Sequence, residues 1–330
     1  MSALAGRRRI VAVAANPSID RLYEVDHLST GAIHRPLAVV ARAGGKGLNA
    51  ARGAVALGAR VTVVGIVAGR AGDWIMEQLA ELGIDARMAR ARGETRSCIS
   101  ILDRSTGLMT ELYEPGDEIG PGAWDEMEAT VAAELARGDV GALTLSGSLP
   151  PGAPVNGFAR IARLVRVTTA DGQRAGTGGL VPIIVDTYGP ALAGVLAERP
   201  AVVKVNAVEA GDMVGLVVDD PATATIAAAV LHERGADGVV VTIGVAGAVV
   251  VTTAGAARLV PPDLRGAYPV GSGDAFMAGL AAALVEGQPL VEAARRGMAA
   301  GIANALLPGA GELDPRTARE LVAQVKVMPT

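Results

Sequence analysis

Residues 269–284 join a glycine-rich turn to an apolar helix, and this stretch constrains the fold and chemistry of the chain more than any other. Gly271, Ser272 and Gly273 form the turn, Asp274 follows, and the next ten residues are apolar or glycine. Glycines allow successive backbone N–H groups to point into one small space, and a helix start adds free N–H groups and partial positive charge. The turn therefore predicts an anion hole that suits a phosphate group.

Asp274 places a carboxylate at the mouth of this predicted anion hole. One interpretation is a general base that accepts the proton of a hydroxyl attacking phosphorus. The other is that Asp274 only caps a buried helix, since aspartate is a favoured cap. The remainder of the chain favours the first interpretation.

Composition excludes several classes of protein. Half of the 330 residues are hydrophobic and only 2% are aromatic, so we expect a large core of Ala, Val, Leu and Ile. The net charge of −4 and the lack of a long basic run argue against a nucleic-acid partner. The single cysteine, Cys98, excludes an internal disulfide, and no uninterrupted apolar run reaches membrane-spanning length. We expect a cytoplasmic protein with no membrane partner.

Strand-like and helix-like segments alternate along the chain from Gly120 onward. Buried strands are predicted at 140–145, 181–185, 201–205 and 238–243, with helices at 123–137 and 155–167 and a surface loop at 168–179. This alternation is typical of an α/β fold with a mostly parallel central sheet and helices on both faces. Because we find no clear linker, a single domain over residues 1–330 is expected.

Two stretches near the N-terminus contain strands without helices. They cover about 21–42 and 95–114, and turn residues break each into short pieces. Together they predict a small β-sheet lid on the main domain. A small sheet has exposed edges and one apolar face, and a partner subunit often covers such a surface.

Several predicted strands end in polar residues. Because the carboxyl ends of parallel strands meet at one edge, we expect these side chains to lie together there. Glu209 suits a hydrated magnesium ion, whereas Asn206 and Glu209 are also spaced as a helix-capping pair, and both interpretations stay open. The residues expected at this edge are Asp20, Asn49, Ser148, Asp186, Asn206, Glu209, Thr242 and Asp274.

A second glycine-rich turn, Ala43-Gly-Gly-Lys-Gly-Leu-Asn49, precedes a helix predicted at 50–57. It matches neither the phosphate loop of nucleotide hydrolases nor the dinucleotide-binding GxGxxG pattern. The glycines suit a sugar that lies against the backbone, with Asn49 supplying an amide. Lys46 is either an additional phosphate ligand or a solvated turn residue.

Six segments of the chain, taken in order, resemble the ribokinase-like carbohydrate kinases of the phosphofructokinase-B group, and most closely its 1-phosphofructokinase and tagatose-6-phosphate kinase branch. The resemblance extends from about residue 10 to 305. It implies a Rossmann-like core with a β-sheet lid that often pairs in a homodimer. The segments are Asn16-Pro-Ser-Ile-Asp20, Gly44-Gly-Lys-Gly-Leu-Asn49, Thr95-Arg96, Ser146-Gly-Ser-Leu-Pro-Pro-Gly152, Asn206-Ala-Val-Glu209 and Gly271-Ser-Gly-Asp274.

The resemblance also implies ATP as phosphoryl donor, Mg²⁺ as cofactor and a role for each matched residue. Asp274 is the implied catalytic base, with Gly271, Ser272 and Gly273 as the anion hole. Asn206 and Glu209 are implied to organise Mg²⁺ through water. The implied nucleotide contacts are Lys204, Asn206, Glu209, Thr242, Gly244, Gly247 and Asn304. The implied substrate contacts are Asp20, Gly44, Gly45, Asn49 and Ser148, with Arg96 meeting a substrate phosphate.

Departures from the family pattern concern the substrate side. Cys98 replaces a common Asn, the Lys near Ala32 and the Arg near Glu111 that some members carry are missing, and Tyr188 replaces a small residue. We expect ATP-dependent conversion of fructose 1-phosphate to fructose 1,6-bisphosphate. The alternatives are a kinase of 6-phosphosugars (tagatose or fructose 6-phosphate), a kinase of an unphosphorylated sugar or nucleoside, and a sugar-binding protein that has lost kinase activity.

Overall fold

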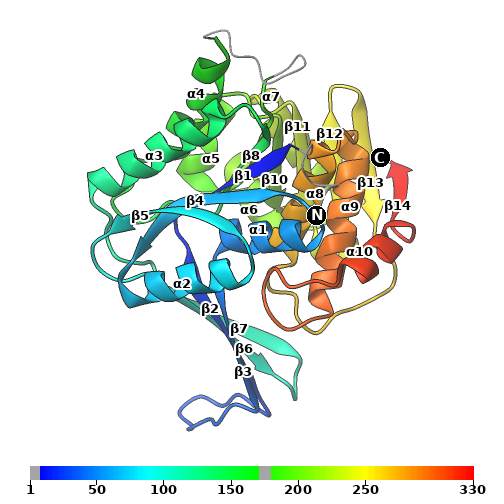
Figure 1. Cartoon of the computed structure of the whole chain (residues 1–330). Helices are drawn as coiled ribbons and strands as arrows, with labels where there is room; N and C mark the ends of the chain where they lie inside the picture. The colour runs from blue at the N-terminus through cyan, green and yellow to red at the C-terminus, as the bar shows by residue number, and fades with distance from the viewer. Residues whose placement is uncertain (1–7, 171–179) are drawn as a thin grey trace.

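The computed structural model describes residues 8–170 and 180–330, and a ten-stranded sheet forms its centre (Figure 1). The strand order is β14-β13-β12-β11-β10-β9-β8-β1-β4-β5. Neighbours from β5 to β11 are parallel, and β12, β13 and β14 continue the sheet in antiparallel pairs. The strands are β1 (Arg9–Ala14), β4 (Val61–Ala68), β5 (Asp85–Ala91), β8 (Val140–Ser146), β9 (Ile183–Asp186), β10 (Val202–Asn206), β11 (Gly238–Thr242), β12 (Ala248–Thr252), β13 (Gly255–Val260) and β14 (Lys326–Pro329).

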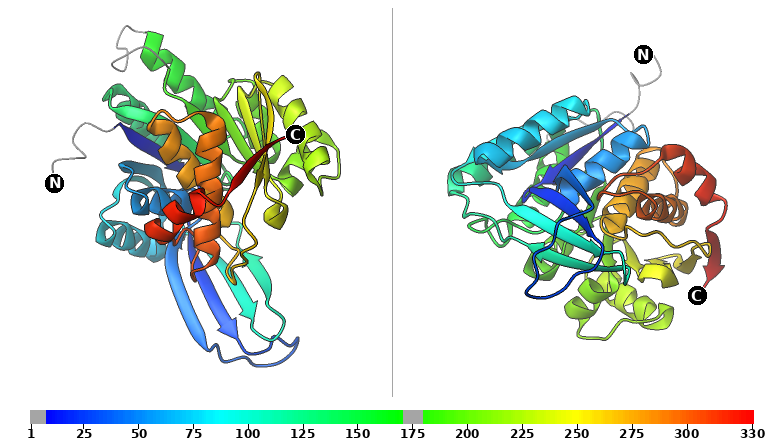
Figure 2. Two further views of the ribbon diagram at one scale, coloured as in Figure 1. Left: turned by 90° about the vertical axis from the view of Figure 1, so that its right-hand side faces the viewer. Right: turned by 90° about the horizontal axis from the view of Figure 1, so that it is seen from below.

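Helices cover both faces of this sheet, as predicted (Figure 2). Alternate residues of β1 face the two cores: Ile10 and Ala12 pack in one, Val11 and Val13 in the other. The first core also contains α1 (Lys46–Ala56), α2 (Gly69–Glu81), α8 (Ser272–Val285), α9 (Leu290–Ala305) and α10 (Pro315–Val322). The second contains α3 (Pro121–Ala136), α4 (Gly157–Ala170), α5 (Gly189–Leu196), α6 (Ala207–Val214) and α7 (Pro221–Glu233). Within the described ranges, no helix has the length and apolar character that crossing a bilayer requires.

A second, four-stranded sheet projects from the main body as a lid (Figures 1 and 2). Its order is β3-β2-β6-β7, in which β2 (Ser18–Val25) is antiparallel to β3 (Ala38–Gly44) and parallel to β6 (Ser97–Asp103), while β7 (Leu108–Tyr113) is antiparallel to β6. The strands extend slightly beyond the predicted 21–42 stretch. Only residues 15–17 separate β1 from β2, so the lid begins at the carboxyl end of β1.

The structure differs from the sequence-based prediction at several elements. Strands β5, β13 and β14, at or next to the two edges of the sheet, were not predicted, because most of their residues are partly or wholly exposed and do not form an apolar run. Helix α1 begins at Lys46, four residues before the predicted start. Helix α4 continues to Ala170, so the first residues of the predicted 168–179 loop are helical, and residues 171–179 lie outside the described residues.

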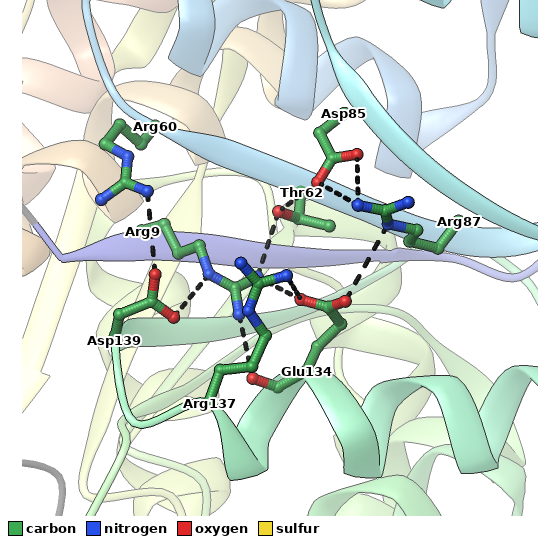
Figure 3. Close-up of polar contacts among 8 residues, drawn as sticks. All are labelled: Arg9, Arg60, Thr62, Asp85, Arg87, Glu134, Arg137 and Asp139. Atoms are coloured by element: carbon green, nitrogen blue, oxygen red, sulfur yellow. Dashed lines mark hydrogen bonds and ion pairs between the residues drawn. The ribbon is translucent and has the colours of Figure 1, made fainter. Parts of the chain in front are cut away.

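A buried ion network ties the amino ends of the central strands together (Figure 3). The Arg9 guanidinium, only 3% exposed, lies 2.7 Å from Asp139 and 2.8 Å from Glu134. It also donates to Thr62 Oγ1 at 3.0 Å and to the Glu134 carbonyl at 2.9 Å. These contacts join β1 to β4, to α3 and to the loop that precedes β8. The network therefore anchors the sheet at the edge opposite the lid.

Candidate active site

A cavity of about 780 Å³ lies where the lid meets the carboxyl edge of the central sheet. Most of the predicted site residues line it: Asp20, Gly45, Asn49, Arg96, Ser148, Lys204, Asn206, Glu209, Thr242, Gly244, Gly271, Gly273 and Asp274. The predicted residues that do not line it are Gly44, Asp186, Gly247, Ser272 and Asn304. The edge of the sheet therefore gathers both halves of the expected site into one space.

The turn before α8 is built around Gly271. This residue caps the helix with φ 83°, a left-handed conformation that side chains disfavour. A Cβ at this position would lie 2.5 Å from the Ala310 Cα, so the loop at 309–311 also excludes a side chain. Asp274 lies in the first turn of α8 and is buried, and Ser272 has a buried Oγ without a partner among the described residues.

A single amide joins the two carboxylates of the site. Asn49 Nδ2 donates to Asp274 Oδ2 at 2.9 Å and to Asp20 Oδ2 at 3.0 Å. The Asn49 carbonyl oxygen accepts from Arg52 at 3.3 Å, which fixes the orientation of the amide. Asp20, which we expect to hold sugar hydroxyls, and Asp274, the expected base, are thus held side by side.

The first glycine turn makes room for this arrangement. A Cβ on Gly44 would overlap the Asp20 carboxylate, and Gly45 caps α1 with φ 86°. The Gly45 N–H also donates to Asp20 Oδ2 at 3.2 Å. Because Gly45 allows the helix to start immediately, Lys46 and Asn49 stand in its first turn and not in a loop before it.

Two lysines and two carboxylates form a charge cluster beside the anion hole. Lys46 Nζ lies 3.0 Å from Asp186 Oδ1 and 2.6 Å from Glu209 Oε1, and Lys204 Nζ lies 2.7 Å from Asp186 Oδ2. A Cβ on Gly273 would lie 3.0 Å from Lys204 Nζ, so this glycine leaves the ammonium open to the turn. Lys46 is therefore not a solvated turn residue.

The charges of the cluster set the pKa values within the site. Burial and the neighbouring Asp186 carboxylate raise the pKa of Asp274 to about 7, against the opposing effects of Lys46, Asn49 and Lys204. Burial alone would raise the pKa of Asp186, but Lys204 and Lys46 hold it below its usual value. A carboxyl with a pKa near neutrality suits a general base.

Asn206 and Glu209 form a complete capping box at the start of α6. Asn206 Oδ1 accepts from the Glu209 N–H at 2.8 Å, and Glu209 Oε2 accepts from the Asn206 N–H at 3.0 Å. Both residues also line the cavity. The described residues contain no group of three or more His, Cys, Asp or Glu side chains that could hold a metal. Magnesium commonly takes one carboxylate plus water and phosphate oxygens, so this pair fits Mg²⁺ bound through water.

Arg96 and Ser148 lie on the substrate side of the cavity. The Arg96 guanidinium donates to the carbonyls of Asn16 and Glu114, each at 3.1 Å, and its buried Nε has no partner among the described residues. Ser148 Oγ accepts from Asn16 Nδ2 at 3.0 Å. Arg42, a cation that the sequence did not single out, also lines the cavity and lies 3.1 Å from Glu312.

The predicted nucleotide residues divide into two groups. Thr242 and Gly244 line the cavity, and Gly247 closes the β11–β12 hairpin with φ 102°. Asn304 is fully buried: it donates to the Val270 carbonyl at 3.3 Å and accepts from the Gly311 N–H at 2.9 Å. Its amide therefore supports the two loops around Gly271 from behind, and we correct its placement beside the nucleotide accordingly.

Two residues of the charge cluster were given no definite role from the sequence, Lys46 and Asp186. Asp186 was expected at this edge because it ends a predicted buried strand, but its pairing with the two lysines was not predicted. Lys46 stands between glycines, but its partners lie 140 and 163 residues away along the chain. Local sequence reasoning left its role open for this reason.

Comparison with known proteins agrees with this geometry. The pfkB family carbohydrate kinase pattern matches residues 12–317. The chain is 34% identical to 1-phosphofructokinase of Rhodobacter capsulatus, over 93% of this chain and 92% of that protein. It is 28% identical to tagatose-6-phosphate kinase of Staphylococcus epidermidis, over 97% and 99%.

Solved structures show the same fold. Phosphofructokinase-2 from Escherichia coli matches with a TM-score of 0.84 and 26% identity, covering 96% of this chain and 98% of that one. Ribokinase from Arabidopsis thaliana, at 19% identity, matches in fold with a TM-score of 0.71 over 96% and 99% of the two chains. The expected ribokinase-like fold is confirmed, and the chain belongs to the pfkB family of carbohydrate kinases.

Proposed function

We propose that this carbohydrate kinase transfers the γ-phosphoryl group of ATP to the 6-hydroxyl of fructose 1-phosphate. The observation that carries the proposal is the Asn49 amide, which holds Asp20 and Asp274 together in a cavity that also contains Arg96. The relative named 1-phosphofructokinase, 34% identical over nearly the whole chain, supports the choice of sugar. Phosphorylation of a 6-phosphosugar is the second candidate, supported by the tagatose-6-phosphate kinase relative.

In this proposal Asp274 accepts the proton of the attacking hydroxyl, and Asp20 with the Gly45 backbone orients the sugar. The backbone of the turn at 271–273 and the first turn of α8 hold negative charge that develops on the transferred phosphoryl group. Lys46 and Lys204 place positive charge on the neighbouring side of the same space. This positioning lowers the barrier without a covalent intermediate on the protein.

The donor set supports ATP with Mg²⁺. Gly244 has open space where a side chain would stand, and the absence of a side chain at Gly273 leaves room beside the buried Lys204 ammonium at the cavity wall, as an anionic nucleotide requires. Asn206 and Glu209 would hold Mg²⁺ through water, and the ion would supply positive charge between the phosphates. Each Glu209 oxygen retains an acceptor site beyond its contacts with Lys46 and the Asn206 N–H.

We also propose a homodimer that forms through the lid. Val39 and Leu112, 53% and 56% exposed, stand on lid strands and do not line the cavity. Exposed apolar side chains on a small sheet are typical of a surface that a second subunit covers. The cytoplasmic location stays a prediction.

A panel of acceptors tests the proposed function. ADP release is measured with fructose 1-phosphate, fructose 6-phosphate, tagatose 6-phosphate, fructose and ribose, and the product is identified by mass spectrometry. We expect the highest kcat/KM with fructose 1-phosphate. A preference for a neutral sugar would overturn the proposed substrate, and release of no ADP with any acceptor would favour a binding protein without kinase activity.

A further inference from the structure

The structure places Tyr188 at the charge cluster. It caps α5 two residues after Asp186, and the intervening Thr187 is fixed by its hydroxyl, which donates to the Gly147 carbonyl at 2.7 Å. Its side chain lines the cavity and is 47% exposed. The Lys46 ammonium lies 5.7 Å from the centre of the Tyr188 ring.

The surroundings of Lys46 come from three separate elements. Asp186 at the end of β9 and Glu209 in α6 contact the ammonium directly, and the Tyr188 ring adds an aromatic face. A ring face attracts a cation within about 6 Å, and more strongly where water is partly excluded. The ring also restricts the conformations of the Lys46 side chain, which has four rotatable bonds.

We propose that Tyr188 is a positioning residue that holds the Lys46 ammonium beside the phosphoryl-transfer space. The inference rests on the proposed function, because it takes Lys46 to act on the transferred group. The Tyr188 hydroxyl has no hydrogen-bond partner among the described residues, so the ring is the part of the side chain that acts. Removal of the ring leaves the contacts of Lys46 with Asp186 and Glu209 in place. The ammonium is then no longer confined on the side where the ring stood.

A double-variant cycle tests whether Tyr188 acts through Lys46. We expect Tyr188→Leu to lower kcat roughly 2–10-fold, the range of a cation–π contact, with little change in the KM for ATP. Tyr188→Phe keeps the ring and should restore most of kcat. In a Lys46→Met background, Tyr188→Leu should have almost no further effect, because coupled residues are not additive.

Lysine labelling provides a readout that needs neither substrate nor activity. The chain contains only three lysines, Lys46, Lys204 and Lys326. Acetylation by an N-hydroxysuccinimide ester, followed by mass spectrometry, gives the labelling rate of Lys46 relative to the exposed Lys326. We expect this ratio to increase at least twofold in Tyr188→Leu and to stay at the wild-type value in Tyr188→Phe.

Each contrary outcome has a distinct meaning. Additive losses in the two backgrounds, or a loss in Tyr188→Phe equal to that in Tyr188→Leu, would overturn the positioning role. A change confined to the KM for ATP would show that the ring stacks on the nucleotide instead. The cycle uses whichever acceptor the wild-type enzyme turns over fastest, so a wrong acceptor overturns the proposed substrate and leaves this test valid.

Discussion

The side-chain nitrogen of Asn49 donates a 2.9 Å hydrogen bond to Asp274, and this bond joins the first turn of α1 to the first turn of α8. Each of these helices starts at a glycine with positive φ, Gly45 and Gly271. The helices also pack closely, since a Cβ on Gly53 would lie 2.9 Å from the Ala278 Cβ. The two glycine turns, far apart in sequence, therefore act as one site.

The first prediction concerns the base. Asp274→Asn keeps the shape of the side chain and removes its basicity, so kcat should fall ~10²–10⁴-fold, the usual contribution of general-base catalysis. Binding of the sugar phosphate, measured by calorimetry, should survive. Turnover within threefold of wild type would return Asp274 to a helix-capping role.

The pH dependence follows from the raised pKa of the same group. The carboxylate form is required, so kcat/KM should fall about tenfold per pH unit below a midpoint near the Asp274 pKa of about 7. Asp186→Asn removes the negative neighbour, leaves Lys204 without its carboxylate partner and leaves Lys46 paired with Glu209 alone, so the acidic limb should move to lower pH. An unmoved limb in this variant would show that another group controls the profile.

Stability should respond to pH in the opposite sense to activity. The Asp274 pKa rises on folding from 3.8 to about 7, so the folded chain binds the additional proton between these values. The contribution of this carboxyl to the free energy of unfolding therefore decreases as pH rises through that window. Denaturant unfolding between pH 5 and 8 should show this decrease in the free energy of unfolding for wild type, and Asp274→Asn, which lacks the carboxyl, should lack this contribution.

The sequence indicated which residues of the turn before α8 and of the strand ends would lie around one cavity, because these signals are local. Gly271 to Asp274 are contiguous, and each predicted strand end indicates which edge of the sheet its polar residues reach. Lys46 could not be assigned, because its role depends on Asp186 and Glu209, which only the fold brings near. Asn304 shows the converse: only the family resemblance placed it beside the nucleotide, and its hydrogen-bond partners in the fold are loop backbone groups.

The Glu209 prediction separates its capping role from its role toward magnesium. Glu209→Gln retains an oxygen for the Asn206 N–H but loses the charge beside Lys46, so the Mg²⁺ concentration for half-maximal rate should rise while the melting temperature changes little. Asp220→Asn is the matched control, because Asp220 forms a capping box on α7 and does not line the cavity. Equal magnesium requirements in all three proteins would leave capping as the role of the pair.

The ion network of Figure 3 should matter for stability and not for catalysis. Arg9→Met leaves the buried Glu134 carboxylate without its closest cation, and loss of one partner of a buried pair typically costs about 3–5 kcal/mol of unfolding free energy. Because the network lies at the amino ends of the strands, kcat at 25 °C should equal that of wild type. Adding Glu134→Gln should restore part of the stability, and a loss below about 1 kcal/mol in Arg9→Met would contradict this view.

The last prediction concerns recognition of the substrate phosphate. Arg96 lines the cavity at the base of the lid, and a guanidinium matches a phosphate with two parallel hydrogen bonds. Arg96→Ala should reduce kcat/KM for fructose 1-phosphate. The reduction should correspond to a loss of roughly 2–4 kcal/mol of transition-state stabilisation, in the range for truncating one partner of a charge pair. Any activity on fructose itself should change little.

Arg96 also holds the carbonyls of Asn16 and Glu114, so part of the loss is structural and needs a control. Arg104→Ala provides it, because Arg104 pairs with Glu24 of the lid strand β2, at 2.6 Å, and does not line the cavity. In Arg96→Ala, the loss of kcat/KM on fructose 1-phosphate should exceed the loss on fructose. If it also exceeds the loss of kcat/KM in Arg104→Ala, recognition of the phosphate is assigned to Arg96. Equal losses on both sugars would mean that Arg96 supports the lid. The substrate phosphate would then need another cation, for which the lid strands offer Arg21 and Arg42, since both residues line the cavity.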